Sequence, residues 1–527
     1  MKADLSRTTF NRLKRFTRVV AQQGRVQLDA DWNEQSSIML YQMRRLAADI
    51  FGPAGGPADN LGFELGVLDP GLTTGASDFS IGGGRYYVDG ILCELDATSH
   101  PISFLDKKVQ IADLSVDGLP FRTDQYVELM DGEKKVAAVQ ARITDVNYAD
   151  RVLTLTDISA FIGGKPKQPL LRRITTFRTQ PEGALGTFDK GLSQIYLDVW
   201  ERLVTYVEDD AMREVALNGP DTSARTKVVW QLGALPVDAK ACMTPAQLQQ
   251  ALQPANRCRL RARVRPGPTD TDPCTIDPDS SYRGHENQLY RIEIHRGSAG
   301  GGKPTFKWSR ENGAVVFPIA SVSGSTVVLE SLGRDDRFGL VESDWVEVQD
   351  DDSVLANRVD PLFRVKVVQR GARRVILSGD VPTGIGKDPS KHPLLRRWEQ
   401  REGDDAAGGL TLDKQDNAAV IPTSSPGDTG WLALEDGVEI QFVDPQNSVY
   451  RTGDYWLIPA RVATGDIEWP SETVPGDPKK RPLSKFPDGV THHYAPLGVV
   501  SLDGTKITRA TECRLHLAGA GPIVRGV

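Results

Sequence analysis

The segment from Gly297 to Lys303 has the residue types and spacing of a phosphate-binding loop. Gly297-Ser-Ala-Gly-Gly-Gly-Lys303 fits the Gly-x4-Gly-Lys pattern, in which backbone N–H groups and a lysine hold phosphates. Two features argue against that chemistry. Pro304 stands where a magnesium-binding hydroxyl is needed, and Thr305-Phe-Lys-Trp308 continues as a strand where a helix should begin. We therefore predict a glycine-rich hairpin loop.

The histidines and cysteines show no recognisable metal-binding pattern. His492 and His493 are adjacent, and neighbouring residues on a strand point to opposite faces, so we do not expect them to share a metal. Cys242, Cys258 and Cys274 are sixteen residues apart, a spacing that fits no known zinc site. With five cysteines and no CxxC pair, we expect reduced thiols and no disulfide framework. No metal and no cofactor is predicted.

Acidic side chains gather at 208–210, 350–352 and 404–405. A glycoside hydrolase needs two carboxylates that face each other across a cleft, and sequence alone does not show such an arrangement. Runs of this kind are more typical of solvated turns. There is also no Gly-x-Ser-x-Gly nucleophile elbow. The sequence therefore predicts no enzymatic activity.

The nine tryptophans raise the possibility of a sugar-stacking surface, because an indole ring packs well on the apolar face of a saccharide. Six of them lie inside or beside strand runs with apolar neighbours, which favours core packing. These are Trp200, Trp230, Trp308, Trp345, Trp456 and Trp469.

The helices and strands that must position these side chains belong to a chain whose composition is typical of globular proteins. Its 527 residues, with 39% hydrophobic and 25% charged side chains, predict about three or four domains. A formal net charge of −7 argues against a nucleic-acid partner. No apolar run is long enough to span a membrane, and the first residues do not form a secretory signal. We expect synthesis in the cytoplasm. If the chain acts outside the cell, something other than a signal peptide must carry it there, and release as part of a particle is one such route.

From about residue 61 the sequence is typical of β domains, with short alternating runs broken by Gly, Pro, Asp and Asn. Asp89-Gly90 between two such runs predicts a type I′ hairpin. A second helix is expected at 244–252, where Thr precedes Pro. Other strands are predicted at 195–200, 227–232, 289–294, 305–308 and 438–442.

One internal repeat is visible. Tyr126-Val-Glu-Leu-Met-Asp131 and Trp345-Val-Glu-Val-Gln-Asp350 share a pattern, and each is followed by two further strand-like runs that contain arginine. We predict two copies of a small antiparallel β module, with chance similarity as the alternative. The predicted domains are a helical docking arm (1–55), a β domain containing the first module near 120–160 (61–185), another β domain (186–335), the second module (340–383) and a C-terminal β domain (384–527). The fold class is mainly β and multi-domain, with antiparallel sandwiches or small barrels and an N-terminal α-helical arm.

The first fifty residues are basic, with nine Lys or Arg against five Asp or Glu. Asp31-Trp-Asn-Glu34 predicts a helix that begins with a capping box, and Gly52-Pro53 ends it. Its apolar stripe steps by 7, 4, 3 and 4 residues and must pack on the body of the chain or on a partner. The predicted docking residues are the cations Arg12, Arg15, Arg18 and Arg25 and the stripe Trp32, Met39, Met43, Leu46 and Ile50. Folding of the helix onto the chain's own β body is the alternative.

Several distinctive sequence motifs occur along the chain. It opens with Phe10-Asn-Arg-Leu-Lys-Arg-Phe16 and Gln22-Gln-Gly-Arg-Val-Gln-Leu-Asp-Ala-Asp-Trp-Asn-Glu-Gln35, and later contains Glu286-Asn-Gln-Leu-Tyr-Arg291 and Tyr450-Arg-Thr-Gly-Asp-Tyr-Trp456. This set resembles an uncharacterised bacterial family encoded with phage-tail-like contractile injection systems. The resemblance implies association with a contractile particle and supplies no catalytic residues.

The leading hypothesis is a structural or accessory subunit of such a particle, docked near the baseplate or tail tip through residues 1–55. Its partners would be other subunits of the particle, with a homo-oligomer also possible, and deletion of residues 1–55 should release a body that stays folded. The first alternative is a particle-borne protein that binds or degrades glycans. The second is a cargo or plug protein of the tube.

Overall fold

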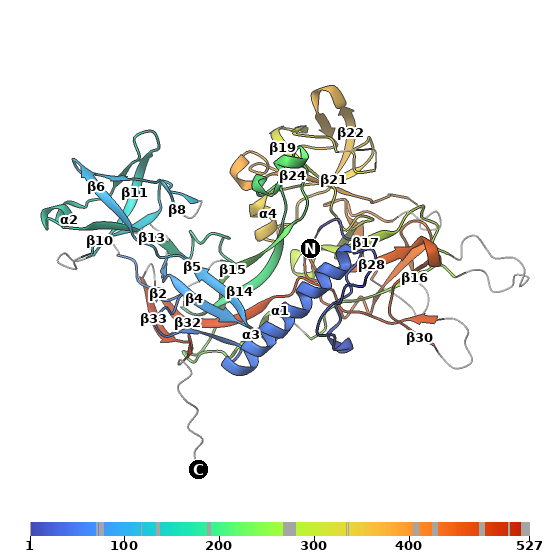
Figure 1. The fold of residues 1–527 in the computed structure, drawn as a ribbon, viewed down its shortest axis with the longest axis horizontal. Helices are drawn as coiled ribbons and strands as arrows, with labels where there is room; N and C mark the ends of the chain where they lie inside the picture. Colours follow the sequence, from blue (N-terminus) through green and yellow to red (C-terminus); the bar gives the residue numbers. More distant parts are fainter. Residues whose placement is uncertain are drawn as a thin grey trace, which may run out of the picture. The chain divides into compact units, whose positions relative to one another are not determined.

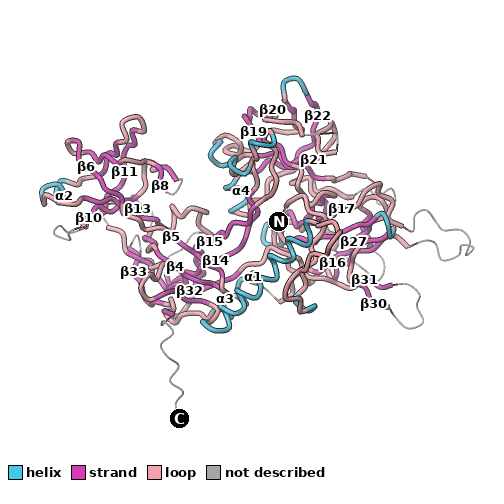
Figure 2. The backbone as a smooth tube through the Cα atoms, in the orientation of Figure 1, coloured by secondary structure: helices cyan, strands magenta, loops and turns pink. Residues whose placement is uncertain are grey.

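The structure, a computed structural model, confirms a mainly β chain with one long helix near the N-terminus (Figure 1, Figure 2). None of the described helices is both long and apolar enough to cross a membrane. The structure describes residues 2–69, 72, 78–116, 119–132, 138–186, 191–253, 255–266, 281–333, 335, 337–403, 410–423, 430–473, 480–503 and 506–517.

The chain divides into two compact units, each assembled from separate stretches of sequence. The first unit contains residues 1–41, 201–227 and 253–491, and the second contains 42–200, 228–252 and 492–527. The domains predicted from the sequence were all contiguous, so their boundaries do not coincide with those of the units. Each unit consists of a two-sheet sandwich and a small barrel.

The sandwich of the second unit encloses one apolar core that both sheets share, with residues such as Tyr86, Leu197 and Leu497. One sheet has the order β34-β1-β4-β5 and the other β15-β14-β32-β33. The strands are β1 (Ala54–Pro57), β4 (Gly84–Val88), β5 (Ile91–Leu95), β34 (His516–Leu517), β14 (Gly191–Val204), β15 (Arg225–Pro236), β32 (His493–Asp503) and β33 (Lys506–Glu512).

The barrel of the second unit closes because β10 pairs with both β11 and β13. The ring of antiparallel pairs runs β6-β7-β12-β11-β10-β13 and back to β6. It surrounds a core that includes Val109, Leu129 and Leu171. Its elements are β6 (His100–Leu105), β7 (Lys108–Ile111), β10 (Tyr126–Asp131), β11 (Val139–Asn147), β12 (Val152–Leu155), α2 (Ser159–Gly163) and β13 (Pro169–Thr176), with β2 (Leu65–Gly66) and β3 (Ser80–Ile81) beside β13 and a hairpin of β8 (Ser115–Val116) and β9 (Leu119–Pro120).

The sandwich of the first unit has a large aromatic core, with Trp308 and Trp456 fully buried. Its sheets have the orders β16-β27-β26 and β25-β18-β17-β28-β29. The strands are β16 (Arg259–Val264), β26 (Leu432–Ala433), β27 (Val438–Val443), β17 (Gln288–Arg296), β18 (Thr305–Ser309), β25 (Ala419–Val420), β28 (Tyr455–Arg461) and β29 (Asp466–Ile467), with a hairpin of β30 (Ser471–Thr473) and β31 (Lys480–Pro482).

The barrel of the first unit has the same strand order as the other barrel. It closes as β19-β20-β23-β22-β21-β24, which matches β6-β7-β12-β11-β10-β13 strand for strand. The sequence repeat therefore falls on three equivalent strands of two barrels with the same strand order, as expected for two copies of one module. The strands are β19 (Val316–Ser323), β20 (Thr326–Leu329), β21 (Trp345–Gln349), β22 (Phe363–Gln369), β23 (Arg374–Leu377) and β24 (Leu394–Trp398).

Helix α1 (Asp29–Phe51) begins before the predicted cap at Asp31. The Asp31 carboxylate instead accepts a hydrogen bond from the Leu28 backbone N–H (3.3 Å), and Glu34 accepts one from the Thr9 hydroxyl (2.7 Å). The predicted capping box is therefore wrong in register. Leu28 occupies the cap position, and the side chain at the third helical position reaches back to its N–H. The predicted C-terminal end is correct.

The Asp89-Gly90 turn has the predicted geometry and also supports α1. Asp89 has φ 48° and Gly90 has φ 76°, and two positive angles are typical of a type I′ turn. A Cβ atom at Gly90 would lie 2.5 Å from the backbone oxygen of Arg44 in α1. Glycine is therefore required both by the turn and by the close approach of the helix.

Two other local predictions are confirmed. The Gly297–Lys303 segment joins the antiparallel strands β17 and β18; it contains one 3-10 turn (Ser298–Gly300) and leads into a strand rather than an α-helix. Helix α3 (Pro245–Leu252) follows Thr244, whose hydroxyl accepts the Gln247 backbone N–H (3.2 Å), while Gln247 Oε1 accepts the Thr244 N–H (2.8 Å). This reciprocal pair is a capping interaction.

The expectation of reduced thiols is wrong for one pair of cysteines. Cys242 and Cys513 form a disulfide in the second unit across 271 residues of sequence. Such a separation gives no local sign of proximity, which is why sequence spacing missed it. Cys93 and Cys258 are free and buried, and Cys274 lies outside the described residues.

One of the acidic runs is structural rather than a solvated turn. Asp350 is buried and caps the short helix α4 (Asp351–Leu355) by accepting the Ser353 backbone N–H at 2.9 Å. Asp351 contacts Arg202 at 3.0 Å and His392 at 2.7 Å. The run at 404–405 lies outside the described residues.

The adjacent histidines have separate partners. His492 Nδ1 lies 2.7 Å from Asp198, and His493 Nδ1 lies 2.7 Å from Asp89. Two different partners agree with the prediction that the side chains point in different directions. Within the described part of the chain, no three His, Cys, Asp or Glu side chains form a group that could hold a metal ion.

Candidate functional site

The first residues of the chain are built into the first unit. The Lys2 ammonium lies 2.9 Å from the Glu293 carboxylate of β17, and the Ala3 carbonyl accepts a hydrogen bond from the Asn312 side chain at 2.9 Å. Further contacts follow along the chain: Leu5 packs beside Leu289 and Tyr455, Arg461 donates to the Ser6 carbonyl, and Arg7 pairs with Glu468.

Lys2 belongs to a buried charge network. Glu293 also accepts a hydrogen bond from Arg291 (2.6 Å), and Lys307 lies 3.5 Å from Glu293 and 2.7 Å from Glu347. Burial lowers the pKa of Lys2 to about 7, an effect that Glu293 offsets only in part. Burial opposes the charge of Glu293, yet the nearby cations outweigh it and hold the pKa of that carboxyl well below its usual range.

This anchor changes what a truncation would test. A deletion of residues 1–55 removes the Lys2 ammonium and leaves the buried Glu293 carboxylate with fewer partners. Removal of one partner from a buried ionic group is strongly destabilising. The structure therefore argues against the expectation that the body stays folded without these residues.

After the anchor, residues 8–28 form an arm that returns along helix α1. The Phe10 and Tyr41 rings lie 5.6 Å apart, and the Gln35 side chain accepts the Val19 backbone N–H at 2.7 Å. At the start of the helix, Asp29 accepts hydrogen bonds from the backbone N–H and hydroxyl of Ser6 (2.9 and 2.6 Å). These contacts fix the path of the arm on the helix.

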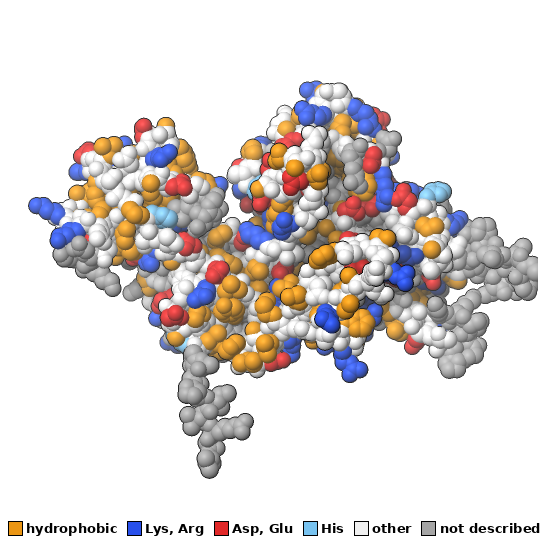
Figure 3. Space-filling view, in the orientation of Figure 1, with side chains coloured by type: hydrophobic (Ala, Val, Ile, Leu, Met, Phe, Trp, Pro, Cys, Tyr) orange, Lys and Arg blue, Asp and Glu red, His pale blue; other side chains and the backbone are white. Residues whose placement is uncertain are grey.

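The arm and helix expose many large apolar side chains (Figure 3). Trp32 is 65% exposed and Met39 is 61% exposed, whereas the buried residues of α1 are Ala30 and Ile38. The predicted stripe therefore does not pack on the chain's own β body. The exposed set comprises Phe10, Leu13, Phe16, Val20, Val26 and Leu28 on the arm and Trp32, Met39, Leu40, Tyr41, Met43, Leu46, Ile50 and Phe51 on the helix.

The arm also carries uncompensated positive charge. Residues 8–28 contain five Lys or Arg and no Asp or Glu. Arg12, Arg15, Arg18 and Arg25 are all exposed, and within the described part of the chain none of them forms an ion pair. We call the exposed apolar side chains of the arm and α1, together with the cations of the arm, the N-terminal surface.

All nine predicted docking residues lie on the N-terminal surface, and their docking role stays a prediction. The apolar half of the arm, including Leu13 (74% exposed) and Val26 (84% exposed), was not among the predicted docking residues. Alternation of apolar and cationic residues between Phe10 and Val20 was the available signal. The anchoring role of Lys2 had no signal, because its partners lie about 290 residues away.

A comparison with protein families covers most of the chain. A model described as a family of unknown function (DUF6519) matches residues 1–102, 131–258 and 238–521. The chain belongs to this family. The DUF6519 match includes the whole N-terminal surface and all of the barrel of the first unit. No curated protein matches the chain, and neither does any solved structure.

Proposed function

We propose that the chain is a non-enzymatic docking subunit of a contractile, phage-tail-like injection particle, attached near the baseplate or tail tip through the N-terminal surface. One observation carries the docking role: a run of exposed apolar side chains lies beside four arginines that make no ion pair within the described part of the chain. The resemblance of the opening phrases to a family encoded with such particles supports the choice of assembly.

The physical chemistry of this surface favours a protein partner. Exposed apolar patches of this kind mark interaction sites, because each Å² removed from water contributes about 25 cal/mol. Arginine and aromatic residues are also the side chains that dominate interface energies. The expected partner is a subunit with an apolar groove rimmed by Asp and Glu, since complementary charge sets orientation and speeds encounter.

The test uses the full chain with a C-terminal tag in its native bacterium, because Lys2 makes the N-terminus unsuitable for a tag. Gentle lysis and affinity capture should recover sheath and tube proteins by mass spectrometry and particles by electron microscopy. Two variants address the surface: W32A/M39A for the apolar part and R15E/R18E for the charge. Each should reduce recovery of particle proteins by about tenfold or more.

A matched control is V215S/L217S, which removes two other exposed apolar side chains (86% and 61% exposed) outside the N-terminal surface. It should leave recovery unchanged. A lone soluble protein, or wild-type recovery with both surface variants, would contradict docking.

Protease treatment of intact particles separates docking from the cargo and plug alternative. A docked subunit should be cleaved, whereas protection inside the tube would overturn the proposal. Binding to anionic lipid vesicles that R15E/R18E abolishes, without recovery of particles, would also contradict it.

A further inference from the structure

The two barrels can be compared residue by residue because their strands pair in the same order. In the second unit, Tyr126 of β10 lies opposite Arg142 of β11 and Ile174 of β13. In the first unit, Trp345 of β21 lies opposite Arg364 of β22 and Trp398 of β24. Directly opposed residues point to the same face of a sheet. Each barrel therefore carries an arginine, an aromatic ring and an apolar residue in one row.

In the second unit, other side chains of the protein contact the residues of this row. Tyr126 is only 8% exposed and packs with Leu68 and Ile174. The guanidinium of Arg142 donates to Asp124 at 2.8 Å. The ring is therefore covered, and the cation already has a carboxylate partner.

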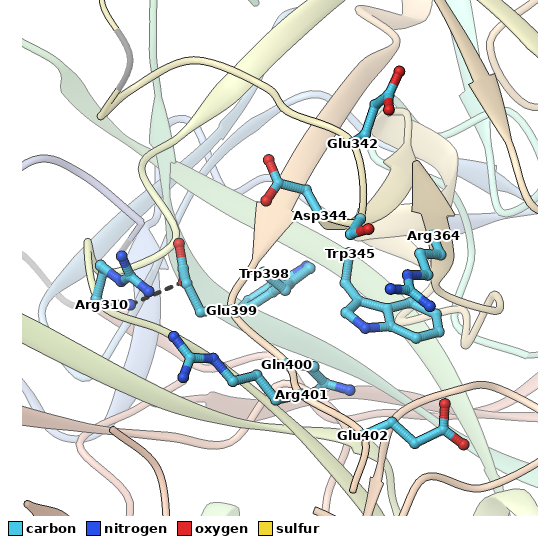
Figure 4. A pocket seen from close by; sticks show the side chains of 11 residues that line it. Arg310, Glu342, Asp344, Trp345, Arg364, Trp398, Glu399, Gln400, Arg401 and Glu402 are labelled. Atoms are coloured by element: carbon cyan, nitrogen blue, oxygen red, sulfur yellow. Dashed lines mark hydrogen bonds between the residues drawn. The ribbon is translucent and has the colours of Figure 1, made fainter. Parts of the chain in front are cut away.

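In the first unit, the same row lines an open pocket of about 650 Å³ (Figure 4). This volume lies within the usual range for small-molecule sites. Trp345 is half-buried, and its indole ring lies next to the exposed Arg364 side chain. Within the described part of the chain, the Arg364 guanidinium has no hydrogen bond or ion pair.

The remaining charges of the pocket are of two kinds. Some are already paired: Arg310 and Arg401 both contact Glu435, at 2.7 and 3.7 Å, and Glu399 accepts from Arg397 at 3.2 Å. The carboxylates of Glu342, Asp344 and Glu402 form no ion pair within the described part of the chain. Asp344 accepts the Val341 backbone N–H at 2.9 Å, and burial raises its pKa.

We propose that this pocket binds a saccharide unit that is neutral or carries an amino group. The Trp345 ring would stack on the apolar C–H face of the sugar. The carboxylates of Glu342, Asp344 and Glu402 would accept hydrogen bonds from hydroxyl or ammonium groups, and Arg364 would donate to a ring or hydroxyl oxygen. Three unpaired carboxylates against one unpaired guanidinium disfavour an acidic sugar. This inference does not depend on the docking proposal, because it uses no residue of the N-terminal surface.

The duplicated barrel supplies the matched control for the test. The full chain and the variants R364A, W345A and R142A would be applied to an array of neutral, amino and acidic oligosaccharides. Affinity for the best ligand would then be measured by calorimetry. R364A and W345A should weaken binding by about tenfold or more, and R142A, at the equivalent position of the other barrel, should not.

Several results would overturn the inference. One is that acidic saccharides bind most tightly, and another is that no member of the array binds. A third is that R364A and R142A lose equal affinity for the best ligand. Trp345 packs against Leu362 and Trp398, so W345A also requires a circular dichroism check of its fold. R364A replaces an exposed side chain and keeps the test valid if W345A does not fold.

Discussion

The Lys2 ammonium lies 2.9 Å from the buried Glu293 carboxylate, and the lysine side chain is itself partly buried. It also lies 5.6 Å from the Trp398 ring centroid, a cation–π distance. The first residues of the chain are therefore anchored on strand β17 of the first unit. The docking arm begins only after this anchor.

We expect Lys2→Ala to destabilise the first unit by about 1–3 kcal/mol, because it leaves the buried Glu293 carboxylate with one fewer cation. Chemical denaturation with a probe in the first unit measures the change. Lys14→Ala, on the exposed arm, is the control and should have little effect. Equal stability of the two variants would show that the buried contact contributes nothing.

Asp454 should make the first unit pH-dependent. Burial raises the pKa of Asp454 to about 6, and Arg257, 2.8 Å away, offsets this only in part. A raised pKa means that the folded state binds the proton more tightly, so this contribution is present below pH 3.8 and is lost as the pH rises through about 6.

The variant Asp454→Asn should not show this loss of stability with rising pH, because its side chain does not titrate. Between pH 3.5 and 7, the stability of the wild type should fall relative to the variant by on the order of 2–3 kcal/mol. Denaturation midpoints across this range measure it. For Glu472→Gln, at an exposed position of β30, the denaturation midpoint should change with pH as it does in the wild type. A parallel curve for Asp454→Asn as well would contradict the assignment.

The Cys242–Cys513 disulfide should stabilise the second unit. Reduction, or the variant Cys242→Ser/Cys513→Ser, should cost about 3–5 kcal/mol, because the bond closes a very long loop. Thermal melts with and without reductant measure the loss, and reductant should not affect the variant. Non-reducing peptide mapping should find the linked pair. A wild-type melting temperature that does not respond to reductant would be inconsistent with this role.

Substitutions on the N-terminal surface should leave stability almost unchanged. W32A/M39A removes side chains that contact little of the folded chain, so the free energy of unfolding should change by about 0.5 kcal/mol or less. Ile38→Ala is the contrast, because Ile38 is buried in α1 and its truncation should cost about 2–4 kcal/mol. A large loss for W32A/M39A would show that its docking phenotype reflects misfolding.

The sequence predicted what local patterns determine. The period of Trp32, Met39 and Ile50 indicated the helix, and Asp89-Gly90 indicated its hairpin, because turn geometry depends on adjacent residues. The repeat was found only where Tyr126 and Trp345 begin similar strands. The other three strands of each barrel show no such similarity and are matched by their pairing alone.

Other features depend on contacts that no local pattern encodes. The Lys2–Glu293 pair, the Cys242–Cys513 bond and the closure of each barrel join residues far apart in the sequence. The pocket at Trp345 was missed for the same reason. Its strand neighbours favoured core packing, which is correct for Trp308 but leaves part of the Trp345 ring accessible.

The order of synthesis gives the discontinuous second unit a particular vulnerability. Strand β14 is complete after residue 204, but its partner β32 begins at His493. At about 5–20 residues per second, the ribosome needs roughly 15–60 seconds to make the intervening chain. During that time β14 has an unpaired edge, which is a template for aggregation. A stop codon before residue 493 would leave that edge permanently open.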